Sequence, residues 1–214
     1  MTEALPRTLY YFADPMCSWC WGFSPVAESI VKSFPDLPVS LVMGGLRSNT
    51  NPMEPAQRKE TLHHWQEVNK RTGQPFQFSD AMPEGFIYDT EPACRAVVSM
   101  IDIRRPAALA YFRSLQNAFY AEGRDITQPE TLARMAGFFD VTPEQFLRHF
   151  ESAATRTKTE RHFTFAREAG VRGFPTIILG DERGLVLLTH GYRSFESLQP
   201  ELEQWLSSSV PLTS

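Results

Sequence analysis

The feature that most constrains the fold is a short apolar segment followed directly by two cysteines. Residues 9–13 (Leu-Tyr-Tyr-Phe-Ala) have the length and apolar character of a buried strand, and Asp14-Pro15 is a turn signal that ends it. After Cys17-Ser18-Trp19-Cys20, apolar residues recur at helical spacing as far as about Ser33. The sequence therefore predicts a strand, a turn and then a helix that has Cys17 at its N-terminus.

A second apolar segment, residues 39–43, is closed by two glycines and completes a strand–helix–strand unit. The chain from 51 to 170 then shows helical patterns, including an apolar face that recurs at i, i+3 and i+4 over residues 108–119. Residues 74–87, rich in proline and glycine, predict an irregular connection. Three Thr-x-x-Glu/Gln capping boxes predict helix starts, at Thr127 with Glu130, Thr142 with Gln145, and Thr157 with Glu160.

The last part of the chain returns to strands. Residues 176–179 and 185–189 are apolar and flank a polar, glycine-bounded turn, which predicts a β-hairpin. An amphipathic helix follows, and Pro200 is expected to fit it only if the helix begins near Ser197. We therefore predict an α/β fold in two parts, a discontinuous domain of residues 1–50 and 171–214 and a helical insertion of residues 51–170.

Charge and apolar run length exclude several classes of partner. Lys and Arg number 21 against 25 Asp and Glu, so the net charge of −4 provides no positive field to attract nucleic acid or an anionic membrane. No apolar run reaches the length of about 18 residues that a membrane-spanning helix needs. The N-terminus lacks the pattern of a signal peptide, and three cysteines are too few for a disulfide framework, so we expect a cytoplasmic protein.

The Cys-x-x-Cys spacing is compatible with zinc binding and with thiol redox chemistry. Zinc needs two further ligands, and neither Cys94 nor the scattered histidines have a suitable spacing, so we expect no metal. At a helix N-terminus, free backbone amides and the helix dipole stabilise a thiolate, which makes Cys17 the expected nucleophile. One turn deeper, Cys20 is placed to attack a mixed disulfide formed at Cys17.

Two motifs together resemble a known family. A strand, the Cys17-x-x-Cys20 motif opening a helix and, far downstream, Gly173-Phe174-Pro175-Thr176 entering a hairpin and a last helix are similar to the thioredoxin fold. The helical insertion resembles its DsbA-like branch, and the segment 14–23 without an export signal looks closer to cytosolic FrnE-like members. The resemblance implies that Cys17 and Cys20 form the redox pair and that Pro175 is the cis-proline beside it.

Aromatic residues near these motifs are candidates for substrate binding. Phe174 precedes the proline and is expected to present its backbone to an extended substrate. Trp19 lies between the cysteines and is a candidate for an exposed apolar rim, whereas Trp21 and Phe23 are better explained as core residues.

Three further residues have structural and functional interpretations. Asp14 is read as a turn residue, with modulation of proton transfer to the thiols as the second possibility. Arg172 is read as a solvated loop charge rather than a partner for the thiolate. Cys94 falls on the apolar face of a predicted helix and is expected to be an inert core thiol of no assigned role.

The resulting prediction is a thiol–disulfide oxidoreductase, a protein disulfide reductase or isomerase, that acts on disulfide-containing proteins or small thiols. It needs no cofactor beyond its own cysteine pair, with glutathione as a possible co-substrate. Kappa-class glutathione transferases and 2-hydroxychromene-2-carboxylate isomerases look similar in topology, but they have Ser where this chain has Cys17. A non-catalytic protein-binding module is the alternative of another class. The sequence predicts neither the physiological substrate nor the oligomeric state.

Overall fold

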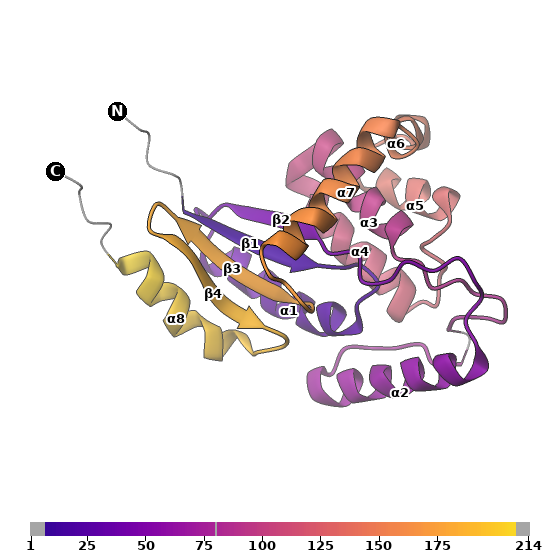
Figure 1. Ribbon diagram of the computed structural model, residues 1–214, viewed down its shortest axis with the longest axis horizontal. Helices are drawn as coiled ribbons and strands as arrows, with labels where there is room; N and C mark the ends of the chain where they lie inside the picture. Colours follow the sequence, from indigo (N-terminus) through magenta and orange to yellow (C-terminus); the bar gives the residue numbers. More distant parts are fainter. Residues whose placement is uncertain (1–6, 80, 209–214) are drawn as a thin grey trace.

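The computed structural model describes residues 7–79 and 81–208 and is built on a mixed four-stranded sheet (Figure 1). The strand order is β2-β1-β3-β4, with β1 parallel to β2 and antiparallel to β3, and with β3 and β4 forming an antiparallel hairpin. The predicted strand–helix–strand unit and the predicted hairpin are both confirmed. The strands are β1 (Thr8–Ala13), β2 (Val39–Met43), β3 (Thr176–Asp181) and β4 (Gly184–His190).

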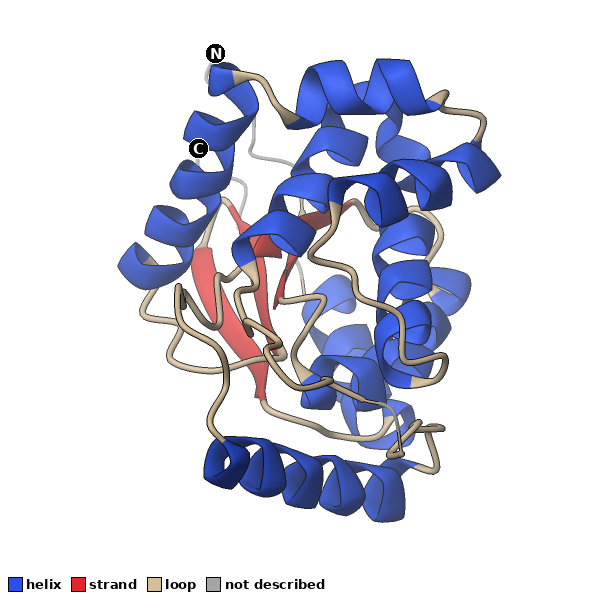
Figure 2. Ribbon diagram, turned by 90° about the vertical axis from the view of Figure 1, so that its right-hand side faces the viewer, coloured by secondary structure: helices blue, strands red, loops and turns tan. Residues whose placement is uncertain are grey.

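Helices surround the sheet and form a separate cluster at one end of it (Figures 1 and 2). α1 connects β1 to β2, and α2 to α7 follow β2 and precede β3 in the sequence. α8 is the last described helix and lies beside β4. The helices are α1 (Ser18–Ser33), α2 (Pro55–Thr72), α3 (Glu91–Arg104), α4 (Ala108–Tyr120), α5 (Pro129–Ala136), α6 (Pro143–Phe150), α7 (Ala153–Glu168) and α8 (Phe195–Ser207), with single 3₁₀ turns at Arg105–Ala107 and Gly137–Phe139.

Alternate residues of β1 face two different packing layers. Leu9 and Tyr11 belong to the main core, where the ring of Tyr11 lies 5.9 Å from that of Phe23 in α1. Tyr10 and Phe12 face the other way, into a smaller cluster beneath α7. This alternation is the period-two pattern of a strand buried on both faces. It explains why the sequence of β1 is apolar throughout.

The last helix of the 51–170 segment lies directly on the sheet. The ring of Phe165 in α7 lies 5.6 Å from that of Phe12, and the backbone N–H of Met43 in β2 donates to His162 Nδ1 at 3.2 Å. The helical segment is thus continuous with the packing of the sheet on this face. Its separation as an insertion domain of residues 51–170 stays a prediction.

The predicted helix starts have mixed outcomes. Thr142 caps α6, accepting from the backbone N–H of Gln145 at 3.3 Å, as predicted. The prediction for Thr127 is wrong by one position, because Gln128 is the residue that precedes α5. The Thr127 hydroxyl instead donates to Asp125 at 2.6 Å. The carboxylate of Asp125, two residues upstream, therefore binds the Thr127 hydroxyl that the capping-box pattern expected to cap the helix.

Two other boundaries differ from the sequence interpretation. Thr157 lies inside α7, because Ser152 already caps this helix by accepting from the Thr155 N–H at 3.1 Å. α8 begins at Phe195 rather than near residue 197, and Pro200 lies within it. Pro200 is on the exposed side of α8, where water can bind the backbone carbonyl that loses its helical N–H donor to the proline. The irregular connection predicted for 74–87 is confirmed at its described residues, 74–79 and 81–87, and the buried face predicted for α4 is confirmed.

Candidate functional site

Cys17 occupies the N-cap position of α1. Its backbone is extended, with φ −92° and ψ 115°, and its carbonyl accepts the first helical hydrogen bond, from the Trp21 N–H at 3.0 Å. Its own N–H donates to the carbonyl of Asp14 at 3.1 Å, which closes the turn between β1 and the helix. The predicted position of Cys17 at a helix N-terminus is therefore confirmed, and its side chain makes no capping hydrogen bond with the first turn.

Cys20 lies one helical turn deeper and is more fully enclosed. The exposed fraction is 6% for Cys17 and 0% for Cys20, and both are free thiols in this structure. Burial raises the pKa of the Cys20 thiol well above its ordinary value, and the adjacent Cys17 adds to the effect. The pair thus consists of two buried thiols: Cys17 keeps a small exposed fraction, and Cys20 is fully enclosed and held protonated by its surroundings.

The loop before β3 meets the cysteines at this point. The Phe174–Pro175 peptide bond is cis, and the Cys17 thiol donates to the carbonyl oxygen of Phe174 at 3.5 Å. The carbonyl of Pro175 accepts from the Gly191 N–H at 2.7 Å, which ties the loop to the end of β4. Segments from the two ends of the sequence are therefore adjacent, and the structure brings together four of the predicted site residues, Cys17, Cys20, Phe174 and Pro175.

Trp19, the fifth predicted residue, is half-buried at the edge of this site. Its ring lies 6.2 Å from the ring of Tyr192, which in turn packs edge-on against Phe23 at 6.4 Å. Tyr192 was not identified from the sequence, because it follows β4 in a loop without periodicity. Trp21 and Phe23 are buried, as expected, and the indole N–H of Trp21 donates to the carbonyl of Pro75 at 2.9 Å.

Asp14 is the charged group closest in sequence to the pair, and it is completely buried. Its carboxylate accepts from the backbone N–H groups of Met16 at 2.8 Å and Leu46 at 2.7 Å. It also accepts from the Thr90 hydroxyl at 2.8 Å and the Cys94 thiol at 3.3 Å. Burial nevertheless outweighs these bonds and raises the pKa of Asp14. Asp14 therefore connects the cysteine turn, the loop after β2 and α3.

Cys94 is buried, as predicted, and burial raises the pKa of its thiol. Its contact with Asp14 has no signal in the sequence, since the two residues come from distant segments. Tyr88 is a second contact between the cysteine turn and the helical segment, because its hydroxyl donates to the carbonyl of Met16 at 2.6 Å. The guanidinium of Arg47 lies 4.6 Å from the centre of the Tyr88 ring. Arg172 is exposed, in agreement with its interpretation as a loop charge.

The described residues, 7–79 and 81–208, contain neither a cluster of metal-ligating side chains nor a helix that could span a membrane. Within them, no group of three or more His, Cys, Asp or Glu side chains is arranged to hold a metal ion. None of the helices in the same residues is long and apolar enough to cross a membrane.

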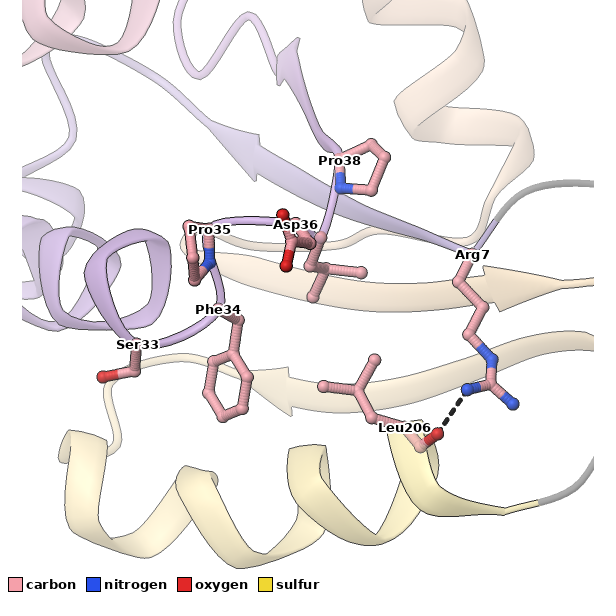
Figure 3. Close-up of a pocket in the computed structure, with 8 residues that line it drawn as sticks. Arg7, Ser33, Phe34, Pro35, Asp36, Pro38 and Leu206 are labelled. Carbon is pink, nitrogen blue, oxygen red and sulfur yellow. Dashed lines mark hydrogen bonds between the residues drawn. The ribbon is translucent and has the colours of Figure 1, made fainter.

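A wide hollow of about 590 Å³ lies at the opposite end of β1 from the cysteines (Figure 3). Figure 3 shows the cation that lines it, Arg7, donating to the carbonyl of Leu206, and the same guanidinium reaches the carbonyl of Ser208 at 2.6 Å. Because that cation is already paired, the hollow offers no comparable chemistry, and the thiol site remains the candidate functional site.

Solved structures of similar proteins share this architecture. The chain is similar to a proposed protein disulfide isomerase from Nitrosomonas europaea, with 40% identity, a TM-score of 0.88 and coverage of 94% of this chain and 98% of that one. It is also similar to the cytosolic disulfide reductase DsbM from Pseudomonas aeruginosa, with 26% identity, a TM-score of 0.77 and coverage of 93% and 98%.

A comparison with curated sequences finds more distant relatives. The ClpXP adapter protein SpxH of Halalkalibacterium halodurans is 21% identical over 198 residues, covering 86% of this chain and 63% of the relative. The chain spans less than two thirds of the length of such relatives. The family model for the DSBA-like thioredoxin domain matches residues 8–203, nearly all of the described chain. The chain therefore belongs to the DSBA-like thioredoxin domain family.

Proposed function

We propose that this protein is a thiol–disulfide oxidoreductase in which Cys17 and Cys20 exchange electrons with a substrate disulfide. One observation carries the proposal: the Cys17 sulfur lies at the N-terminus of α1, 3.5 Å from the carbonyl oxygen that precedes Pro175, with Cys20 one turn deeper. The similarity to a protein named as a disulfide reductase supports it. Reduction or isomerisation of disulfides in a reducing compartment is the proposed direction.

The proposed reaction has two exchange steps. The Cys17 thiolate attacks one sulfur of the substrate disulfide, which forms a mixed disulfide and releases the other sulfur as a thiolate. Cys20 then loses its proton and attacks the Cys17 sulfur, which releases the second substrate thiol and leaves a Cys17–Cys20 disulfide. The substrate gains two electrons and the cysteine pair loses two, so the balance closes.

The buried surroundings of Cys20 determine how this thiol loses its proton in the second step. Burial raises the pKa of Cys20, so free solvent does not readily take its proton. Asp14 is the buried carboxyl whose charge acts on Cys20, and its own pKa is raised by burial. We propose that Asp14 accepts this proton, either directly or through a water molecule.

The rim of the site suits an extended polypeptide substrate, and a small thiol is proposed to recycle the cysteine pair. The half-buried rings of Trp19, Tyr192 and Phe174 offer apolar contacts to an extended polypeptide. Glutathione is the proposed recycling thiol: two molecules reduce the Cys17–Cys20 disulfide and leave as oxidised glutathione. The structure of DsbM with glutathione, which is 26% identical to this chain with a TM-score of 0.78, supports this choice.

Turnover of insulin disulfides with glutathione as reductant tests the proposal. Cys17→Ser is expected to abolish turnover, and Cys20→Ser is expected to accumulate a mixed disulfide that mass spectrometry detects. Cys94→Ser, which removes the third buried thiol but keeps a hydrogen-bond donor to Asp14, is the matched control and should retain turnover. Equal turnover in Cys17→Ser and the unmodified protein would refute the proposal.

The redox state of the pair can be followed through neighbouring tryptophans. Trp19 lies between the cysteines, and Trp21 stacks on Tyr120 at 6.4 Å immediately after them. A titration with mixtures of reduced and oxidised glutathione should therefore change the tryptophan fluorescence in one two-electron transition. The Cys17→Ser variant should show no transition.

An adapter function is the second candidate, because three curated relatives are named as ClpXP adapter proteins. It requires a binding surface but no redox cycle. A Cys17→Ser, Cys20→Ser double variant separates the two functions, since an adapter would still co-elute with purified ClpXP. Failure of both the unmodified chain and the double variant to co-elute would exclude this candidate.

A further inference from the structure

A second cavity lies between α1 and α4, with Tyr11 of β1 also lining it. Its volume is about 220 Å³. For comparison, an apolar protein cavity of about 150 Å³ is large enough to bind benzene. Much of its wall is apolar, contributed by Ala27 and Val31 from α1 and by Leu109 and Phe112 from α4. The cavity therefore has the size and lining of a site for a small ring-containing molecule.

Three buried polar side chains also line this cavity. Tyr11, Ser24 and Gln116 have exposed fractions of 2%, 4% and 0%. The hydroxyl oxygens of Tyr11 and Ser24 and both amide atoms of Gln116 have no hydrogen-bond partner among the described residues. A buried polar atom without a partner costs stability, and native proteins contain few of them. Four such atoms around one cavity therefore indicate a partner that is not part of the chain.

The charged groups at the cavity are, by contrast, already paired. The guanidinium of Arg113 in α4 forms an ion pair with Glu28 in α1, and Lys32 lies 3.9 Å from the same carboxylate. These residues are partly exposed, so they sit toward solvent. The buried groups without a partner, on Tyr11, Ser24 and Gln116, are all neutral, whereas the charged side chains lie toward solvent, so the interior of the cavity matches a neutral ligand.

We infer that this cavity is a binding site for a small neutral molecule with an apolar ring and a carboxamide or equivalent group. The amide of Gln116 offers one donor group and one acceptor, which match the acceptor and donor of a ligand amide. The hydroxyls of Tyr11 and Ser24 can each donate or accept, so they can satisfy the remaining positions. Phe112 provides a ring face for the apolar part.

This site is separate from the thiol site. Its described lining residues include neither Cys17, nor Cys20, nor any residue of the 173–176 loop. Tyr11 links the two sites, because its ring packs against Phe23 in the same core as Cys20 and its hydroxyl is within electrostatic range of Cys20 and Cys17. The inference therefore goes beyond the proposed oxidoreductase function and does not depend on it.

Benzamide is the probe, and N,N-dimethylbenzamide is its matched control because it keeps the ring and carbonyl but lacks the N–H donors. In ¹H–¹⁵N correlation spectra of the full chain, benzamide at millimolar concentration should shift backbone signals of α1 and α4 and the side-chain NH₂ signals of Gln116. N,N-dimethylbenzamide should bind at least tenfold more weakly, a loss of about 1.4 kcal/mol or more. The Cys17→Ser variant should bind benzamide as the unmodified protein does.

Two variants test the lining residues. Gln116→Leu keeps the side-chain size but removes the unpartnered amide, so it should raise the melting temperature while reducing benzamide affinity at least tenfold, as loss of a good hydrogen bond predicts. Leu109→Trp should fill the cavity and abolish binding. Absence of benzamide shifts in the unmodified protein would overturn the inference. A lowered melting temperature of Gln116→Leu together with unchanged benzamide binding would also overturn it. Either outcome would mean that internal water molecules, and not a ligand, are the hydrogen-bond partners of the four polar atoms.

Discussion

The ring of Phe174 occupies the space where a side chain at position 44 would stand. An ideal Cβ built on Gly44 would overlap the ring atoms of Phe174. The backbone N–H of Gly44 donates to the carbonyl of Ala13 at 2.9 Å, so the glycine is fixed at the end of β1. The neighbouring Gly45 has a φ of 65°, a backbone angle that glycine adopts without strain. Gly44 has a different role, because it admits the residue that faces Cys17.

Gly44→Ala should therefore displace Phe174 and lower both stability and insulin turnover. The new methyl group cannot fit without moving the aromatic ring, and such overpacking typically costs about 1–3 kcal/mol. Urea unfolding measures the stability change, and the insulin assay measures the turnover. Gly137→Ala is the matched control, because a Cβ at position 137 meets no atom within 4 Å and its φ is −58°. Equal effects of the two substitutions would contradict this explanation.

The three cysteines should differ sharply in their rates of alkylation. Cys17 has an exposed fraction of 6% and lies at a helix N-terminus, whereas Cys20 and Cys94 are fully enclosed. Burial raises the pKa of both enclosed thiols, so little reactive thiolate forms on them at neutral pH. Timed pulses of iodoacetamide followed by peptide mass spectrometry should label Cys17 first, and urea-unfolded protein should label at all three positions. Early labelling of Cys20 in the native state would contradict the prediction.

Local patterns were sufficient to predict the strands of the sheet and the position of Cys17 at a helix N-terminus. The strand before Cys17, the apolar helix after it and the hairpin at 176–189 each have a periodicity or turn signal that depends only on neighbouring residues. The position of Pro175 beside Cys17 could not be obtained in this way. It was expected from the resemblance, because two motifs far apart in the sequence occurred in the family's order.

Contacts that depend on distant packing could not be predicted from the sequence. Asp14 was interpreted mainly as a turn residue, yet it accepts hydrogen bonds from Leu46, Thr90 and Cys94, which lie on three separate parts of the chain. None of those partners has a spacing or motif that points to Asp14. Tyr192 was missed for the same reason, since its contact with Trp19 arises only when the last loop folds back.

The hydroxyl of Thr90 should be measurable as a stabilising contact of Asp14. Thr90→Val keeps the shape of the side chain but leaves the carboxylate without one of its donors, which should cost about 1–3 kcal/mol. Thr90→Ser retains the hydroxyl and should lose less stability. Urea unfolding at neutral pH compares the three proteins. Equal losses in the valine and serine variants would show that packing of the methyl group matters rather than the bond at 2.8 Å.

Asp14 should also give a characteristic pH dependence of stability. Burial raises its pKa in the folded protein, so the unfolded carboxyl, with a pKa of about 3.9, ionises at lower pH than the folded one. The contribution of Asp14 to stability is therefore fully present below that unfolded value. It is lost as the pH rises through the raised folded pKa. The free energy of unfolding of the unmodified protein, minus that of Asp14→Asn, should fall as the pH rises from about 4, as series of urea unfolding curves can measure.

Asp181→Asn provides a control of opposite sign. The Arg183 side chain, which donates to Asp181, lowers the pKa of this carboxyl. The stability that Asp181 provides is therefore present above the unfolded pKa and is lost as the pH falls through the lowered folded value. The free energy of unfolding of the unmodified protein, minus that of Asp181→Asn, should rise with pH over the acid range, where the difference for Asp14→Asn falls. Slopes of the same sign for the two substitutions would mean that a general acid effect, and not the burial of Asp14, controls the pH dependence.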